Sequence, residues 1–434
     1  MAVATVELVL TGFVGVMLVS QILSLKAKVP YTLVLVFIGV GITAVSSLTS
    51  LGSNPVTNAL QDGILQMRSF YTGLADGGLF VGLVVPPLIF EAMMHIRAPD
   101  LRAVIRPSVL LATLGVLIAT LVGGLTLWQL AGLSPTVSFL FAAIIAPTDV
   151  ATVLEIFRRV SVPSKLATLM DTEAAFNDAT GIVIFTLVLS SVGLTRVPIL
   201  SGFLLFGFTT LGGAGVGFLV AFAARRVSLA VEDKMAEVIL TVSAVYGSYV
   251  LASGLGTSGL IAVAVVGLYF GNVIMRTTMR QDVRDSILIF WQIAAFVGNS
   301  VAFLLIGFET DLLGLSQSIF LIFAGYLAVT VARAASVYPI LALFSQVGEK
   351  IPITWSNVAM LGGVRGALSI ALAASLSASA LVSDSDVHVI SSMVLGVAFL
   401  SITIQTPLLS RYIKRKFGNQ QLLIGPVPGN ASGS

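Results

Sequence analysis

The sequence predicts an all-α polytopic membrane protein of about thirteen transmembrane helices. Of its 434 residues, 57% are hydrophobic and only 10% are charged, whereas a soluble domain carries about 25% charged residues. Apolar runs of about 20 residues, the length of a helix that crosses a bilayer, recur along the whole chain. The short alternating segments of an outer-membrane barrel are not seen. The spans are therefore expected to be helices.

The apolar runs define the individual spans. The connections between them are short, so we expect no inserted soluble domain. The first run lacks the basic segment and the small-residue cleavage site of a signal peptide, so it is interpreted as the first span. The longest gap, 50–76, is polar and has room for a short interfacial helix. The predicted spans cover residues 6–25, 31–49, 77–95, 107–131, 136–158, 165–193, 197–224, 235–253, 257–275, 285–309, 316–345, 355–380 and 386–411.

The basic residues predict the orientation of these spans. If the C-terminus is cytoplasmic, Arg68 and Arg196 lie in outer loops, Arg333 and Arg365 lie inside spans, and the other 19 of the 23 Lys and Arg residues are cytoplasmic. The positive-inside rule predicts such a bias. We therefore expect an outside N-terminus, a cytoplasmic C-terminus and a place in the plasma (inner) membrane. Arg333 is interpreted as reaching the headgroups or lining a subunit interface.

Thirteen spans divide into two six-helix repeats of opposite topology, spans 1–6 and 8–13, joined by one extra helix. In this scheme the fifth span corresponds to the twelfth, and both are interrupted. The fifth contains Pro147 within "AAIIAPTDVATV", and the twelfth contains Gly362, Gly363 and Gly366 within "LGGVRGAL". Paired broken helices place half-helix ends and unwound carbonyls near the bilayer midplane, where an ion can reach them. We expect these two helices to cross there.

Few acidic residues fall deep within spans, namely Glu91, Asp149, Glu173 and Asp178. A charge at bilayer depth costs at least about 2.5 kcal/mol on insertion scales, so each is a candidate functional residue. The sixth span begins near Lys165, and a helix rises 1.5 Å per residue, so Asp178 is expected about 20 Å into the membrane, near its midplane. This position favours Asp178 as the central group.

The neighbours of Asp178 suggest supporting roles. Arg365 is interpreted as the one buried cation available for pairing, so we expect a structural ion pair between Glu173 and Arg365 that leaves Asp178 free to exchange partners. Asn177 shares a face with Glu173, since the two are four residues apart. Its amide is expected to bridge the two broken helices or to cap a half-helix end.

Three further oxygen-bearing residues are candidates to meet a cation. Thr148 and Asp149 follow Pro147, which removes one backbone donor and frees carbonyls nearby. Asp149 suits a monovalent cation and the capping of the following half-helix equally well. Glu91 ends the stretch "VVPPLIFE", and it lines a cytoplasmic funnel, reaches the ion, or lies among the headgroups.

At this point the chain resembles the NhaP-type sodium/proton antiporters, the branch of the cation–proton antiporter superfamily that includes animal sodium/proton exchangers. Five stretches carry the resemblance in the family's order, and together they span most of the chain. They are "PPLIFE" (86–91), "APTDVATV" (146–153), "EAAFNDATGIVIF" (173–185), "FWQIAAFVGNSVAFLLIGFE" (290–309) and "GGVRGALSIALA" (362–373).

The resemblance implies a homodimer in which each chain has a core domain with the crossed helices and a separate interface domain. It also implies that Asp178 carries the ion or the proton, that Glu173 pairs with Arg365, and that Glu91 and Thr148 help to coordinate Na⁺. The expected parts are interface-side helices in 1–95, core helices in 96–193, a linker helix and interface-side helices in 194–315, core helices in 316–414 and a cytoplasmic tail in 415–434.

Two departures from the family pattern concern the details of the ion site. The family often has a serine whose hydroxyl touches the ion directly after the glutamate of the Asn-Asp motif, and here that residue is Ala174. The usual Thr-Asp-Pro order is rearranged to Pro147-Thr148-Asp149. Both leave the choice between sodium and potassium open.

The predicted function is secondary antiport of Na⁺ (or Li⁺) against H⁺ across the lipid bilayer by alternating access, with both ions competing for Asp178. The exchange is expected to be electroneutral, one for one, because the Asn177 amide cannot titrate. A role in pH homeostasis follows, with no cofactor and no nucleic-acid partner. Absence of cysteine excludes a disulfide scaffold and a thiolate metal site.

Three other functions are compatible with parts of this sequence. K⁺/H⁺ exchange would use the same machinery. A sodium-coupled symporter would need a larger polar or aromatic substrate cavity, for which the sequence gives no sign. An intramembrane hydrolase would need two facing carboxylates, but Glu173 and Asp178 are five residues apart on one helix. We therefore predict a transporter and not an enzyme.

Overall fold

The structure is a computed structural model, and it describes residues 3–27, 29–49, 79–160, 162–192, 199–231, 233–309, 318–346, 351–376, 379 and 381–417. Every regular element in these ranges is a helix, and π-helical turns η1 to η3 interrupt three of the spans. The elements are α1 (Val3–Ala27), α2 (Tyr31–Thr49), α4 (Leu79–Leu83), α5 (Val85–His95), α6 (Ala98–Leu110), η1 (Leu111–Gly115), α7 (Val116–Ala131), α8 (Pro135–Ile145), α9 (Ala151–Arg159), α10 (Ser164–Ser190), α11 (Ile199–Ser228), α12 (Lys234–Gly254), α13 (Gly259–Tyr269), η2 (Phe270–Ile274), α14 (Met275–Thr277), α15 (Gln281–Glu309), α17 (Ile319–Gln346), α18 (Ile353–Leu361), α19 (Ala367–Leu376), α20 (Asp384–Leu400), η3 (Ser401–Gln405) and α21 (Thr406–Phe417).

This architecture confirms the predicted fold class, an all-α protein with many membrane spans. Nine helical segments in the described ranges are long and apolar enough to cross a membrane, and three shorter apolar helices accompany them. Each predicted span contains helix. The count of thirteen and the inverted repeat stay predictions, and the interfacial helix expected in 50–76 lies outside the described residues.

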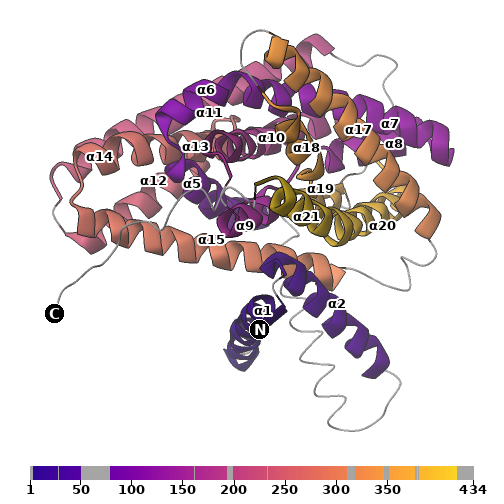
Figure 1. Ribbon diagram of the computed structural model, residues 1–434, viewed down its shortest axis with the longest axis horizontal. Coiled ribbons are helices and arrows are strands. Elements are labelled where there is room, and N and C mark those ends of the chain that lie inside the picture. The colour runs from indigo at the N-terminus through magenta and orange to yellow at the C-terminus, as the bar shows by residue number, and fades with distance from the viewer. Residues whose placement is uncertain are drawn as a thin grey trace.

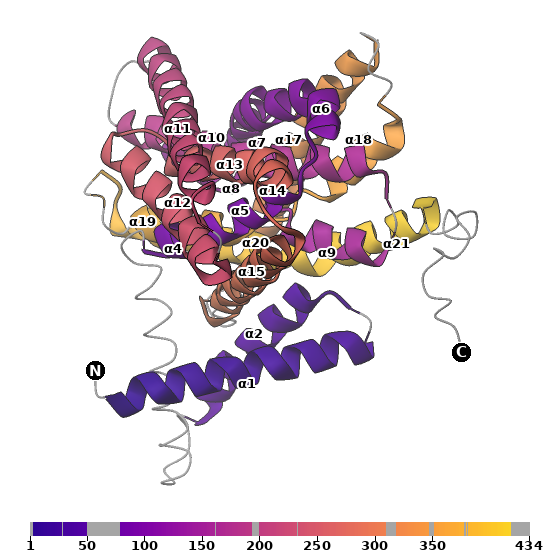
Figure 2. The ribbon, with the colours of Figure 1, turned by 90° about the vertical axis from the view of Figure 1, so that its left-hand side faces the viewer.

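The helices gather in two groups on either side of α10 (Figures 1 and 2). In one group, α11, α12 and α13 pack on one another, and α13 packs on α5. In the other, α7 packs on α8 and α17, and α20 packs on α17 and α19. The long helix α15 packs on α5 and α2, and α1 packs on α2 at the edge of the bundle.

Two predicted spans are broken near their middle, as the sequence indicated. The first consists of α8 and α9, and its break spans 146–150. Ser134 caps the start of α8 by accepting a hydrogen bond from the Val137 amide, and Pro147 ends the helix because it has no N–H and its ring clashes with the preceding turn. The second broken span consists of α18 and α19, which are separated by the glycine-rich residues 362–366.

The two breaks touch each other. The Asp149 amide donates to the Val364 carbonyl at 2.8 Å, and these residues form an isolated antiparallel bridge. Unwound backbone in a membrane must find hydrogen-bond partners inside the protein, and each break here supplies one to the other. The expected crossing of the fifth and twelfth spans is therefore present in the structure.

The contact between α2 and α15 depends on two facing glycines. A Cβ on Gly39 would lie 2.8 Å from the Gly307 Cα and 2.9 Å from the Leu304 carbonyl oxygen. These are backbone atoms, which cannot turn aside as a flexible side chain can. Small residues at a helix interface let two backbones approach closely in a membrane. The Gly39–Gly307 contact thus fixes the distance between α2 and α15.

We predict that Gly39→Ala lowers the melting temperature of the detergent-solubilised protein, because the added methyl overpacks the contact at a cost of about 1–3 kcal/mol. Gly41→Ala on the same helix is the matched control, since a Cβ there meets nothing within 4 Å. Thermal unfolding of both variants checks this. Equal melting temperatures for the two would contradict the assigned packing.

Candidate functional site

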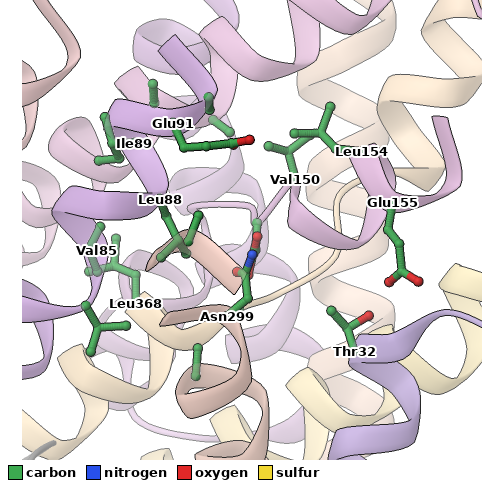
Figure 3. Close-up of a pocket in the computed structure, with 18 of the residues that line it drawn as sticks. Thr32, Val85, Leu88, Ile89, Glu91, Val150, Leu154, Glu155, Asn299 and Leu368 are labelled. Carbon is green, nitrogen blue, oxygen red and sulfur yellow. The ribbon is translucent and has the colours of Figure 1, made fainter. Parts of the chain in front are cut away.

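A cavity of about 550 Å³ opens beside the crossing of the broken helices (Figure 3). Residues from α2, α5, the α8–α9 break, α10, α15 and α19 line it. Four of the predicted site residues share this cavity, namely Glu91, Thr148, Asp149 and Asp178. The other three, Glu173, Asn177 and Arg365, are buried and are not among its lining residues.

Two acidic residues of α10, Asp171 and Asp178, line the cavity, and Asp178 is the deeper of the two along the helix. Its carboxylate makes no hydrogen bond or ion pair with any residue that the structure describes, whereas Asp149 and Glu173 are the charged groups that act on it electrostatically. An ionised carboxylate at this depth lacks the stabilisation of a counter-charge. Asp178 is therefore suited to hold a mobile proton or cation.

Asn177 connects α10 to the first break. Its Nδ2 donates to the Thr148 hydroxyl at 2.9 Å and to Glu173 Oε1 at 3.2 Å. The Thr148 hydroxyl in turn donates to Glu173 Oε1 at 3.4 Å. The Asn177 amide is thus bonded to the break of the first broken helix. None of its hydrogen bonds with described residues reaches the second broken helix. The expected bridge between both broken helices is made instead by the backbone of Asp149 and Val364.

The side chain of Asp149 lies against Gly366, just before α19 begins. A Cβ on Gly366 would collide with the Asp149 carboxylate, so glycine is required at this position. A negative charge at a helix N-terminus is favourable because the backbone N–H groups point toward it. Asp149 thus lies at the start of α19, the second half of the other broken span, and also lines the cavity. Its two expected roles, at the cation and in capping the half-helix that follows it, stay predictions.

Glu91 lies on α5 at the cavity wall and is 8% exposed. Its Oε1 is 3.7 Å from Nδ1 of His95, one turn further along the helix, whose side chain is 52% exposed. Figure 3 shows the Glu91 carboxylate extending into the cavity from α5. It therefore faces the cavity, which favours a role in a funnel or at the ion over a place among the headgroups.

The structure corrects the expected ion pair. Glu173 pairs with Arg333 of α17, whose Nη1 and Nη2 reach the two carboxylate oxygens at 2.8 and 3.0 Å. Both side chains are buried, with 1% of Glu173 and 5% of Arg333 exposed. Arg333 was expected to reach the headgroups or to line a subunit interface, and the structure instead buries it against Glu173. It lies 14 residues into its helix, about 20 Å along the axis, too deep to reach the surface.

Arg365 instead binds the end of the first half-helix. Its Nη1 donates to the carbonyls of Ala146 and Pro147 at 2.7 and 3.0 Å. Arginine near a helix C-terminus satisfies carbonyls that have no intrahelical partner. Pro147 ends α8 and leaves such carbonyls beside Arg365. Arg365 binds these carbonyls, and Glu173 is paired with Arg333.

Arg333 likewise binds a carbonyl near the end of the first half of the second broken helix. Its Nε and Nη2 donate to the Ala359 carbonyl near the end of α18, at 3.3 and 3.0 Å. Each broken helix therefore ends its first half against an arginine from elsewhere in the chain. The positive charge of each arginine also stabilises the half-helix, because the C-terminal end of a helix dipole is negative.

The mouth of the cavity is bordered by contacts between α2 and α9. The Glu155 carboxylate accepts a 2.7 Å hydrogen bond from the amide of Tyr31, the first residue of α2. Thr32 and Thr152 share a hydrogen bond at 3.1 Å, and the Tyr31 hydroxyl meets Ser300 of α15 at 2.8 Å. Figure 3 shows Thr32 and Glu155 side by side at the edge of the pocket. The sequence analysis missed these residues because they lie near the ends of spans.

Comparison with known proteins now gives the family. Residues 13–415 match the transmembrane sodium/hydrogen exchanger family. The chain belongs to this family. Its members are transporters, so the expectation that this chain is not an enzyme is confirmed.

Several members are similar over most of the chain. The Na⁺/H⁺ antiporter ApNhaP of Aphanothece halophytica is 34% identical over 375 residues, which cover 85% of this chain and 67% of that protein. The Na⁺/H⁺ antiporter NhaP of Pseudomonas aeruginosa is 33% identical over 348 residues, covering 78% and 81%. The structure of the sodium proton antiporter MjNhaP1 from Methanocaldococcus jannaschii at pH 8 matches with a TM-score of 0.69 at 21% identity, covering 96% and 99%. The resemblance to NhaP-type antiporters is thus confirmed, and with it the fold.

We predict that Glu173 and Arg333 are energetically coupled, whereas Glu173 and Arg365 are much less so. Removing one partner of a buried ion pair costs about 3–5 kcal/mol, so Glu173→Gln and Arg333→Met should each lower the melting temperature sharply. Their double variant should lose far less than the sum of the two. A double-mutant cycle with Arg365→Met in place of Arg333→Met is the matched control and should be close to additive.

The two cycles are read from unfolding of the purified protein in detergent. A larger coupling energy for Glu173 with Arg365 than with Arg333 would contradict the pairing described above.

Proposed function

We propose that the chain exchanges Na⁺ (or Li⁺) for H⁺ across the membrane, and that the cation and the proton compete for Asp178. The observation that carries this proposal is the position of Asp178, which faces the cavity without a partner among described residues, while the nearby Glu173 is held by Arg333. A carboxylate that moves between the two sides of the membrane as part of the protein needs its charge neutralised, because an uncompensated charge at this depth is costly. Either ion does this, and one excludes the other.

The groups beside Asp178 support an exchange of one cation for one proton. Glu173 is held by Arg333, so its carboxylate is already paired, and one proton or one monovalent cation neutralises Asp178. The neighbouring Asn177 is an amide and cannot take up a second proton.

The arrangement of helices supports alternating access. In our proposal the core domain consists of 96–193 and 316–414, and the interface domain consists of 1–95 and 194–315. The core carries the cation and moves past the interface domain within a homodimer. The chain lies in the plasma (inner) membrane with its N-terminus outside and its C-terminal tail, 415–434, in the cytoplasm, as the basic residues predict. Its activity serves pH homeostasis.

Oxygen ligands for the cation are available around Asp178. We assign Glu91 and Thr148 as further ligands because both line the same cavity, and carboxylate and hydroxyl oxygens suit hard cations. Asn177 and Asp149 position this set. Several relatives are named as Na⁺/H⁺ antiporters, which favours Na⁺ as the cargo. K⁺/H⁺ exchange stays the alternative because Ala174 offers no hydroxyl to the cavity.

We predict that the apparent KM for Na⁺ rises as the pH falls, because protonation of Asp178 removes the cation site. The limit for one competing proton is about tenfold per pH unit. At a fixed subsaturating Na⁺ concentration the rate should therefore be bell-shaped against pH. Proteoliposomes assayed with Na⁺, Li⁺ and K⁺ in turn check both the competition and the choice of cation.

Asp178→Asn is the matched variant for that experiment and should abolish exchange while the protein stays folded, since the amide keeps the size of the side chain. Continued Na⁺/H⁺ exchange by Asp178→Asn, or a wild-type KM that is constant over two pH units around the optimum, would sink the proposed competition.

We further predict that transport does not respond to the membrane potential, because the charge on the moving site is compensated in both loaded states. A potential set with valinomycin and K⁺ in proteoliposomes should leave the exchange rate unchanged. Acceleration with one sign of the potential and slowing with the other would instead indicate unequal numbers of charges moved each way.

A further inference from the structure

The side of α15 that faces the cavity carries a polar residue with no role so far. The residues Gln292, Phe296, Asn299 and Ala302 recur every three or four positions and line the cavity together, as one face of a helix does. Asn299 lies two turns further along α15 than Gln292. Figure 3 shows the Asn299 side chain pointing into the pocket.

The amide oxygen of Asn299 has no hydrogen-bond partner among the residues that the structure describes. This Oδ1 atom is buried. Leaving a buried polar group unpaired costs about 1–3 kcal/mol, so an amide in this position indicates a partner that is not a fixed part of the chain. The amide oxygen of asparagine is a ligand that hard cations accept.

The opposite wall of the cavity explains what such a ligand would do. Asp178 faces the cavity from α10, but the residues one turn before it on the same face, Ala174 and Ala175, are alanines. Helix α10 therefore supplies no further side-chain oxygen one turn before Asp178, and its other carboxylate at the cavity, Asp171, lies two turns before it. A cation held by Asp178 must take its remaining ligands from other elements that line the cavity, and α15 presents Asn299 there.

We propose that Asn299 is a ligand that α15 supplies to the cation at Asp178. This inference rests on the proposed function. Because α15 belongs to the proposed interface domain and Asp178 to the core, the contact exists only while the core is in the arrangement seen here. Asn299 therefore raises the affinity for the cation on one side of the membrane and not on the other, and it biases the direction in which the exchanger loads.

The test compares Asn299→Ala with wild type in everted and in right-side-out membrane vesicles, so that Na⁺ meets each side in turn. We expect the apparent KM for Na⁺ to rise by about tenfold on one side only, with the maximal rate within about twofold of wild type. Asn299→Asp keeps an oxygen at this position and should keep the KM close to that of wild type. Gln292→Ala removes an amide from the same face two turns away and should leave KM unchanged.

Three results would overturn the inference: an unchanged KM in Asn299→Ala, an equal rise on both sides, or an Asn299→Asp variant that behaves like Asn299→Ala. If Asn299→Ala fails to fold, an Asn299→Asp protein with a raised KM overturns it as well. Failure of the proposed function is seen separately, because the wild-type vesicles would then show no exchange of Na⁺ for H⁺ at all.

Discussion

The bidentate contact between Arg333 and Glu173 organises the centre of this transporter. It neutralises a carboxylate that lies only five residues from Asp178 on the same helix, so two neighbouring acidic groups have different tasks. Glu173 in turn accepts hydrogen bonds from Thr148 and Asn177. The first break is thereby held against α10 by a group whose charge is permanently compensated. Because Arg333 pairs with Glu173, it leaves the Asp178 carboxylate without an ion-pair partner among the described residues.

The two arginines also solve a problem that broken helices create in a membrane. Each first half-helix ends in carbonyls without intrahelical partners, which water cannot satisfy at this depth. Arg365 binds those of α8 and Arg333 binds one near the end of α18, while the Asp149–Val364 bridge joins the breaks directly. The crossing is therefore a firmly bonded unit. In the proposed mechanism, a cation site on this unit keeps its shape while the core moves.

The sequence predicted the features that depend on local chemistry. The fold class follows from apolar runs, and both breaks follow from Pro147 and from the glycines around Arg365, because these residues act on the backbone where they stand. Asp178 and its cavity neighbours could be named because charges at bilayer depth are costly wherever they occur. These inferences need no knowledge of which helices are adjacent.

The partner of Glu173 could not be predicted in this way. Arg333 and Arg365 both lie inside predicted spans, but only Arg365 was taken as a partner. Which arginine reaches Glu173 depends on the packing of α17 against α18, which no periodicity encodes. The depth of Arg333 in its helix was a usable signal that the sequence analysis undervalued. In the sequence, Asn299 is only a polar residue in an apolar span, and its role depends on the cavity that it faces. Long-range contacts of this kind require the three-dimensional arrangement.

The separation of the ion-pair partners along the chain has a consequence for biosynthesis. Glu173 and Arg333 are 160 residues apart, which at 5–20 residues per second is roughly 8 to 32 s of translation. During that interval α10 resides in or near the membrane with its carboxylates uncompensated. Among the candidate spans in the described ranges, this helix (Ser164–Ser190) has the lowest mean hydropathy, 1.3. We therefore expect α10 to be retained stably in the bilayer only after α17 has been made, and a chain truncated before Arg333 to be degraded faster than the full chain.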